Sequence, residues 1–118
     1  MKAHIVVAYP EPKSFNAHLA TVAKRTLMDR GWAVSVSDLY EMGFDPCEKA
    51  AHYADPNDAT RFDTQSEQRH ASATETIPAE VRAEIDRMAQ ADLVILQYPM
   101  WWHLPPAILK GWMDRVFI

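Results

Sequence analysis

The chain has 118 residues, of which 48% are hydrophobic and 24% charged, enough for one globular domain with a modest core and too few for two. Its formal charge of −4 and isoelectric point near 5.7 argue against binding to nucleic acid or to an anionic membrane, because both need a cationic face. Cys47 is the only cysteine and no apolar run approaches the roughly 20 residues that span a bilayer, so we expect a cytoplasmic protein without a disulfide.

A strand, a helix and a second strand are predicted first. Residues 3–8, AHIVVA, form an apolar run rich in β-branched residues, typical of a parallel strand covered on both faces. A helix follows, with Ser14 or Asn16 as its N-cap and Gly31 as a left-handed cap at its end. Its apolar residues recur at helical spacing: Phe15, Leu19, Val22, Ala23 and Leu27. Residues 32–39, WAVSVSDL, then alternate with period two and predict the second strand.

Residues 39–78 form a long acidic excursion. They contain eight acidic and three basic residues, so their net charge of −5 exceeds that of the whole chain. Their periodicity is weak and their middle is rich in Ser, Thr and Gln. Plain connections of this length are uncommon, so we expect a functional excursion, a partly disordered segment or a solvated loop.

The last three elements are a helix, a strand and a helix. Pro78 suits the first turn of a helix whose apolar face comprises Val81, Ile85, Met88 and Ala89. Residues 91–99, ADLVILQYP, predict a third buried strand. Pro105 and Pro106 can open the final helix. Its broad apolar face comprises Ile108, Leu109, Trp112, Met113, Val116 and Phe117.

This element order predicts an α/β fold with a doubly wound parallel sheet. One common order for such sheets places strand two on one side of strand one and strand three on the other, giving 2-1-3. Ligands bind where the order reverses, in the crevice at the carboxyl ends of the strands. Two loops face that crevice, residues 9–15 and residues 99–104, and they are the most unusual stretches of the chain.

The first loop offers groups that suit a phosphate. The helix that begins there directs free N–H groups and a positive dipole end at the crevice. Ser14 adds a hydroxyl group, Asn16 an amide and Lys13 a positive charge. The alternative is that Ser14 and Asn16 only cap the helix.

The second loop, YPMWWHLPP, offers aromatic surface. Trp101 and Trp102 could form a flat wall for a planar redox cofactor, with main-chain N–H groups at its polar edge. The alternative is that both are core or interface aromatics, and neighbours in sequence cannot both face the same way. His103 alone is an ordinary packed or exposed histidine as readily as an acid or base.

Several other kinds of site lack their residues. With only Gly31, Gly43 and Gly111, neither a G-x-G-x-x-G turn nor a Walker A loop is possible. No serine lies in a G-x-S-x-G elbow, and the histidines have no H-E-x-x-H spacing. We therefore expect no metal site.

Three motifs together resemble a known family. They are SFN before a helix, SDLYEMGFDP after the second strand, and ADLVILQYPMWWHLPPAILKGWMDRVF near the end. They are similar to the flavodoxin-like NAD(P)H:quinone oxidoreductases of the DT-diaphorase type. The similarity covers nearly the whole chain and is weakest over residues 48–77.

The resemblance implies a flavin site made of both loops. The first loop, with Ser14, Phe15 and Asn16 and with His18 alongside, would bind the flavin diphosphate. The second, with Pro99, Met100, Trp101, Trp102 and His103, would line the isoalloxazine ring. The family usually has other residues at Trp101 and His103, and its first loop often carries a histidine where Tyr9 or Pro10 stands.

The implied function is two-electron hydride transfer from NADH or NADPH to a quinone by a ping-pong mechanism. The motifs favour FAD, with FMN as the alternative, and the final helix and the tryptophans would suit a homodimer. A second interpretation is a non-catalytic flavin-binding or regulatory module, such as the ancillary subunits of potassium-efflux systems. A third is an interaction module without cofactor, with Trp101 and Trp102 in an interface.

Members of this family continue beyond the DRVF helix with two further strands. We therefore expect a single flavodoxin-like domain over residues 1–118 that is incomplete at its C-terminus and contains only the first three strands of the sheet. Strand three would then be an apolar edge, which is a liability in water. On its own the chain would bind flavin weakly and turn over poorly.

Overall fold

Three parallel strands form the single sheet of the protein. The computed structural model describes residues 1–118, with β1 (Lys2–Val7), β2 (Ala33–Asp38) and β3 (Leu93–Gln97) in the order β2-β1-β3. The central strand pairs Ile5 with Val36 on one side and with Ile95 on the other. The α/β fold and the strand order expected from the sequence are both confirmed.

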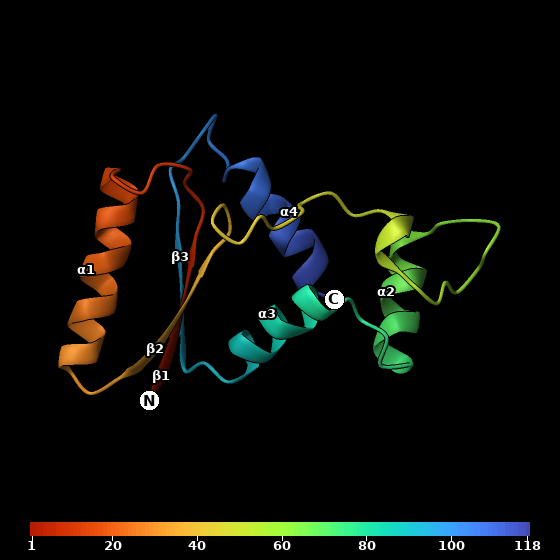
Figure 1. Cartoon of the computed structure of the whole chain (residues 1–118), viewed down its shortest axis with the longest axis horizontal. Helices are drawn as coiled ribbons and strands as arrows, with labels where there is room; N and C mark the ends of the chain where they lie inside the picture. The colour runs from red at the N-terminus through yellow and green to blue at the C-terminus, as the bar shows by residue number, and fades with distance from the viewer.

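Helices cover both faces of this sheet. Helix α1 (Phe15–Asp29) lies on one face, and α3 (Ala79–Ala89) and α4 (Ala107–Val116) lie on the other (Figure 1). The larger core cluster joins the sheet to α3, α4 and the start of the excursion. Its buried members are Val6, Ala8, Leu39, Phe44, Val81, Leu109, Trp112 and Val116. Most of the predicted apolar faces of α3 and α4 therefore form or flank the core, but Ala89 and Phe117 are exposed.

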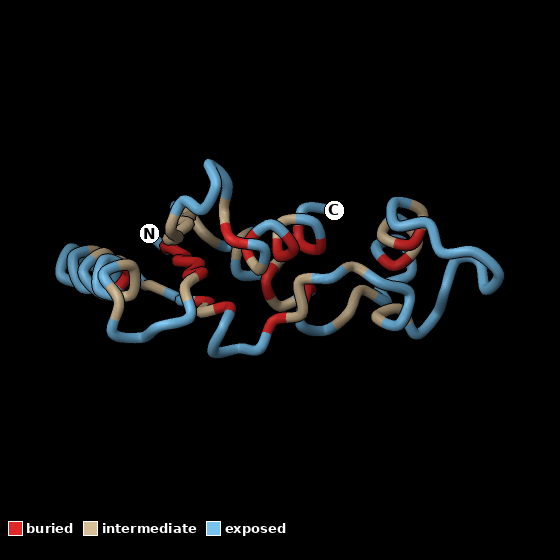
Figure 2. Tube along the Cα trace, turned by 90° about the horizontal axis from the view of Figure 1, so that it is seen from above, coloured by how far each residue is buried: buried red, intermediate tan, exposed pale blue.

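The opposite layer, under α1, is thinner than predicted. Only Ala20 of this helix is buried, in a small cluster with Ile5 and Val7. Phe15 is 73% exposed, and Leu19 and Val22 are also exposed. Figure 2 shows α1 mostly in the colour of exposed residues, with shorter stretches in the intermediate colour. The helix was located correctly, but of its predicted apolar face only Ala23 packs against this cluster, and Phe15, Leu19 and Val22 are exposed instead of buried.

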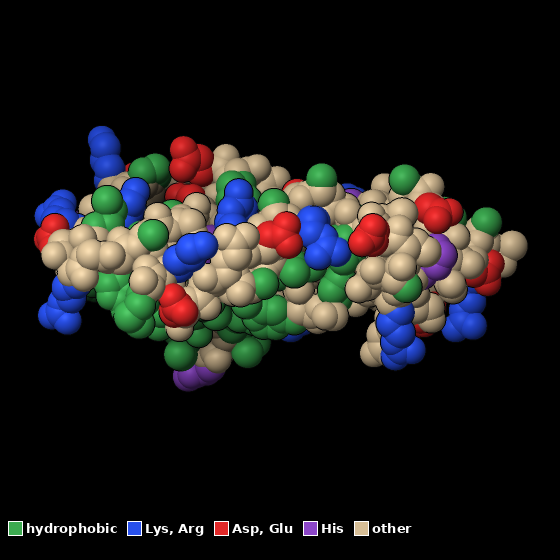
Figure 3. All heavy atoms as spheres, turned by 90° about the horizontal axis from the view of Figure 1, so that it is seen from below, with side chains coloured by type: hydrophobic (Ala, Val, Ile, Leu, Met, Phe, Trp, Pro, Cys, Tyr) green, Lys and Arg blue, Asp and Glu red, His purple; other side chains and the backbone are tan.

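Strand β3 lies at one edge of the sheet. Its residues are only partly buried, and Leu93 is 38% exposed. Seen from below, hydrophobic side chains gather along the lower margin of the molecule, on the side of β3 (Figure 3). The expectation of an apolar edge at strand three is confirmed.

The acidic excursion contains ordered structure that the sequence did not reveal. It holds a short 3₁₀ helix, η1 (Ala50–His52), and the helix α2 (Thr64–Ala73), which stands apart from the sheet (Figure 1). The periodicity of α2 is weak because Ala71 is its only buried apolar residue. The available signal was its N-cap, since the side chain of Asp63 accepts a hydrogen bond from the Ser66 N–H.

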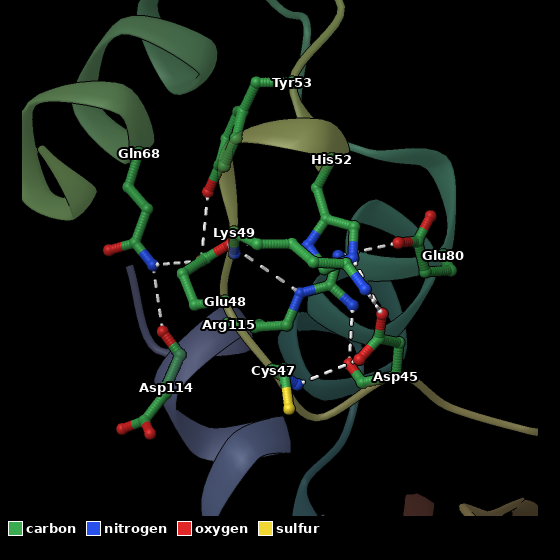
Figure 4. A network of polar contacts seen from close by, with 10 residues as sticks. All are labelled: Asp45, Cys47, Glu48, Lys49, His52, Tyr53, Gln68, Glu80, Asp114 and Arg115. Carbon is green, nitrogen blue, oxygen red and sulfur yellow. Dashed lines mark hydrogen bonds and ion pairs between the residues drawn. The ribbon is translucent and has the colours of Figure 1, made fainter. Parts of the chain in front are cut away.

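A polar network anchors the excursion to α4 (Figure 4). Arg115 is 2% exposed and donates to the Asp45 carbonyl oxygen (2.8 Å) and to Glu80 Oε1 (2.7 Å). Gln68 of α2 donates to Glu48 Oε2 and to the Asp114 carbonyl oxygen, both at 2.9 Å. Because these hydrogen bonds join residues of different elements, we interpret the network as an anchor of the fold.

This network perturbs the titration of its members. Burial raises the pKa of Glu80, but the hydrogen bond from Arg115, a main-chain hydrogen bond and the charge of Arg115 together outweigh it and leave the pKa below its ordinary value. Lys49 and the Cys47 N–H hold the pKa of Asp45 well below its usual range. The Glu80 carboxylate therefore stays ionised beside Arg115, as a buried guanidinium requires.

None of the helices combines the length and the apolar character that a membrane span needs.

Candidate functional site

Helix α1 begins at the carboxyl end of β1 and presents unpaired donors there. Ser14 is its N-cap, and the Ser14 Oγ accepts a hydrogen bond from the Ala17 N–H at 3.1 Å. The main-chain N–H groups of Phe15 and Asn16 have no protein acceptor. Because Ser14 Oγ acts only as an acceptor in the cap, its own proton remains to be donated. Capping and anion binding are therefore compatible at this residue.

Asn16 does not cap the helix. Its Oδ1 accepts a hydrogen bond at 2.9 Å from Nε2 of Gln97, which is the last residue of β3. Sequence analysis missed Gln97, although a polar residue at the end of the apolar strand LVILQ was a usable signal. The contact places the first turn of α1 beside the end of β3, as expected of two elements that border one crevice.

The second loop is a tight turn at the end of β3. Trp101 and Leu104 exchange both main-chain hydrogen bonds, at 2.9 and 3.0 Å, around Trp102 and His103. These two central residues have φ angles of 51° and 62°, in the left-handed region that residues other than glycine rarely adopt. Such strain is typical of functional loops.

The two tryptophans have different surroundings. The Trp101 ring lies edge-to-face with the Tyr9 ring of the first loop, with the ring centroids 6.0 Å apart. Trp102 is 94% exposed. The core alternative is therefore wrong for both residues. The Tyr9–Trp101 contact is a second link between the two loops.

The other residues implied by the resemblance flank this pair of loops. Pro99 is partly buried, whereas Met100 and His103 are exposed beside the tryptophans. His18 is exposed on the second turn of α1, and none of its side-chain atoms makes a hydrogen bond. The structure thus joins the two loops through Asn16 and Trp101, and it does not link His18 to them.

The residues present fit a flavin. An anionic diphosphate needs donors, and the N–H groups of Phe15 and Asn16 with the Ser14 hydroxyl supply them at a helix N-terminus. A planar ring needs apolar surface with donors at its polar edge. The Met100 and Trp102 side chains supply exposed surface, and the N–H groups of Trp102 and His103 have no protein acceptor.

A second polar cluster is closed to any ligand. Glu84 is fully buried between the sheet and α4, and it accepts from Ser37 Oγ (2.9 Å) and Trp112 Nε1 (3.0 Å). His4 Nε2 lies 3.3 Å from the same Ser37 Oγ, and Arg87 pairs with Glu84. Serine, histidine and carboxylate together suggest acid–base chemistry, but His4, Ser37 and Glu84 are all 0% exposed. The cluster is structural.

No group of three or more His, Cys, Asp and Glu side chains in the structure could hold a metal ion.

Comparison with protein families matches residues 1–118 to a family described as having a flavodoxin-like fold. The chain belongs to this flavodoxin-like family. The resemblance expected from the three motifs is confirmed at the level of relatives as well. The chain is 41% identical, over 98% of its length, to ribosyldihydronicotinamide dehydrogenase [quinone] of Mus musculus, and it covers 50% of that protein.

Two further relatives bear related names. NAD(P)H dehydrogenase [quinone] 1 of Rattus norvegicus is 37% identical over 99% of the chain, which covers 43% of that protein. A solved structure from Klebsiella pneumoniae, provisionally named a quinone reductase, superposes with a TM-score of 0.95 at 38% identity. That similarity covers 99% of this chain and 45% of the other. The flavodoxin-like chain thus spans about half the length of the relatives it matches.

Proposed function

We propose that the chain binds a flavin between its two crevice loops and acts in NAD(P)H:quinone oxidoreduction. The observation that carries the proposal is the pairing of unpartnered donors at the start of α1 with an exposed aromatic turn at the end of β3. The names of the relatives support the same reaction class. Quinone is the substrate class that these names indicate.

Each loop has a distinct task in this proposal. The N–H groups of Phe15 and Asn16, with the Ser14 hydroxyl, bind the diphosphate, and Pro99, Met100 and Trp102 lie against the ring. Trp101 supports the turn by packing on Tyr9. Bound flavin would supply the redox chemistry, two-electron hydride transfer from NADH or NADPH to a quinone in a ping-pong order. The protein contributes binding and orientation, which explains why the crevice needs no nucleophile.

The finer assignments are also proposals. We favour FAD over FMN, and a homodimer as the assembled form. Trp112 is fully buried inside the domain, so of the tryptophans in the second loop and the final helix only Trp101 and Trp102 are exposed for a dimer contact. A cytoplasmic location would suit the exposed free thiol of Cys47, because a reducing compartment preserves thiols.

Visible absorption tests the proposal first. Addition of FAD to the purified chain should give saturable binding, seen as a shift of the flavin band near ~450 nm, and NADH with a quinone should then be consumed. Bound flavin without NADH oxidation would favour the non-catalytic flavin-binding module instead. Absence of saturable binding of either FAD or FMN would contradict the proposal and favour an interaction module.

Two substitutions of Ser14 separate capping from phosphate binding. Ser14→Ala removes both the cap and the hydroxyl group. The free energy of unfolding should therefore fall by about 1 kcal/mol, and the affinity for FAD should fall as well. Ser14→Asp retains a good cap, and its charge is favourable at a helix N-terminus, so stability should remain within about 0.5 kcal/mol. The same charge repels a diphosphate, so the dissociation constant for FAD should rise at least about tenfold.

Urea unfolding and flavin titration of the same three proteins provide the measurement. If Ser14→Asp binds FAD as tightly as the unsubstituted chain, this helix N-terminus does not hold the diphosphate.

A further inference from the structure

Gln97 connects three parts of the crevice. Its main-chain carbonyl oxygen accepts from the Ala8 N–H at 3.0 Å, where β1 ends. Its side-chain Nε2 donates to Asn16 Oδ1 at 2.9 Å, so the bond spans 81 positions of sequence. Both side chains are partly buried. Gln97 is therefore the residue through which β3 contacts the side chain of the first turn of α1.

This contact determines which end of the Asn16 amide is free. An amide carries an acceptor oxygen and a donor nitrogen on one carbon, and rotation about the preceding bond exchanges their positions. The Gln97 N–H holds Oδ1 on the side of β3. Nδ2, which makes no hydrogen bond within the protein, is then directed away from Gln97. An anion in the crevice meets a donor under this arrangement and would meet a repelling oxygen under the reverse one.

We propose that Gln97 is a positioning residue, which orients the Asn16 amide so that its N–H donors serve the anionic part of the flavin. The inference rests on the proposed function, because it takes the ligand of the first loop to be a flavin phosphate. Gln97 itself does not touch the ligand. Its effect on binding therefore passes through Asn16.

A double-mutant cycle tests this dependence. Gln97→Met keeps the length of the side chain but cannot donate, so the dissociation constant for FAD should rise roughly fivefold or more, because a misaligned amide loses part of its hydrogen bond to the charged group. In the Asn16→Ala background the same substitution should change the constant less than about twofold, because there is no amide left to orient. Gln65→Met, on the exposed face of α2, is the matched control and should leave FAD binding unchanged.

A merely structural role of Gln97 makes different predictions. It would weaken FAD binding by the same factor in both backgrounds, in parallel with a loss in the free energy of unfolding measured with urea. That result would overturn the inference while leaving the proposed function intact. Absence of saturable FAD binding by the unsubstituted chain would overturn both.

A second measurement follows the Asn16 side chain in the unsubstituted chain itself. In the unsubstituted chain, the Asn16 side-chain NH₂ signals in a ¹⁵N-correlated NMR spectrum can be assigned by their loss in Asn16→Ala. They should shift during an FAD titration if Nδ2 faces the ligand. Signals that stay in place while other residues of the first loop shift would contradict the inference.

Discussion

Replacing Glu84 by alanine is expected to lower the free energy of unfolding by about 3–5 kcal/mol, the usual cost of removing one partner from a buried charged cluster. The Glu84 carboxylate is fully buried and accepts hydrogen bonds from Ser37 Oγ and Trp112 Nε1. Its loss would leave the indole N–H of Trp112, which is also fully buried, without an acceptor. A cavity beside α4 would add to the cost.

Urea unfolding measures this effect against two controls. Glu84→Gln keeps the shape and one acceptor oxygen, so its loss should be smaller. Asp86→Ala changes a carboxylate on the same helix whose side chain is 54% exposed, and its effect should stay within about 0.5 kcal/mol. A loss below about 1 kcal/mol for Glu84→Ala would show that the carboxylate is not needed by its donors.

The same cluster makes stability depend on pH. Burial by itself raises the pKa of Glu84, but its polar contacts with His4, Trp112 and Ser37 outweigh burial and leave the pKa below the ordinary value of 4.5. The unfolded chain therefore takes up this proton first as the pH falls. The stabilisation is complete above pH 4.5 and is lost as the pH drops toward the folded-state pKa. The free energy of unfolding is measured against pH for the unsubstituted chain and for Glu84→Gln, and the difference between the two profiles cancels the contribution of the other carboxylates. A difference that does not change with pH would contradict the role of Glu84.

Gly111→Ala is expected to destabilise the protein by about 1–3 kcal/mol or more, the range for overpacking of a well-packed interior. This is the reverse of the usual result, because alanine is favoured over glycine inside a helix by roughly 0.5–1 kcal/mol. A Cβ atom at this position would lie 2.1 Å from the Pro46 carbonyl oxygen and 2.3 Å from the Pro46 Cβ atom. Gly111 therefore allows the excursion to cross α4 at close range.

The clash should also loosen the excursion. Arg115 donates to the carbonyl oxygen of Asp45, the neighbour of Pro46, so moving that backbone would disturb the anchor of residues 45–52. Urea unfolding gives the stability, and limited trypsin digestion at Arg61 and Arg69 reports the loosening. Lys110→Ala, at an exposed position of the same helix, is the control and should change stability by about 0.5 kcal/mol or less. A Gly111→Ala variant as stable as the unsubstituted chain would contradict the close approach.

The apolar patterns predicted most of the fold. AHIVVA and LVILQ became strands, and the spacing of Leu109, Trp112 and Val116 placed α4 on the core. Helix α2 escaped prediction because Ala71 is its only buried apolar residue, so its sequence has almost no apolar period. Hydrogen bonds of Gln68 to Glu48 and Asp114 hold it in place instead, and such bonds leave no periodic signal.

For the candidate site, the sequence alone determined the two loops and offered Ser14 as one of two possible caps, because local chemistry and strand topology select them. The tertiary structure showed that Ser14 is the cap and that Trp102 and His103 lie in a tight turn. Only the tertiary structure decided that Asn16 pairs with Gln97 and Trp101 packs on Tyr9. It alone also showed that Gly111 makes room for Pro46. These contacts join residues that are far apart along the chain, so their partners depend on how the helices pack on the sheet, which no local pattern encodes.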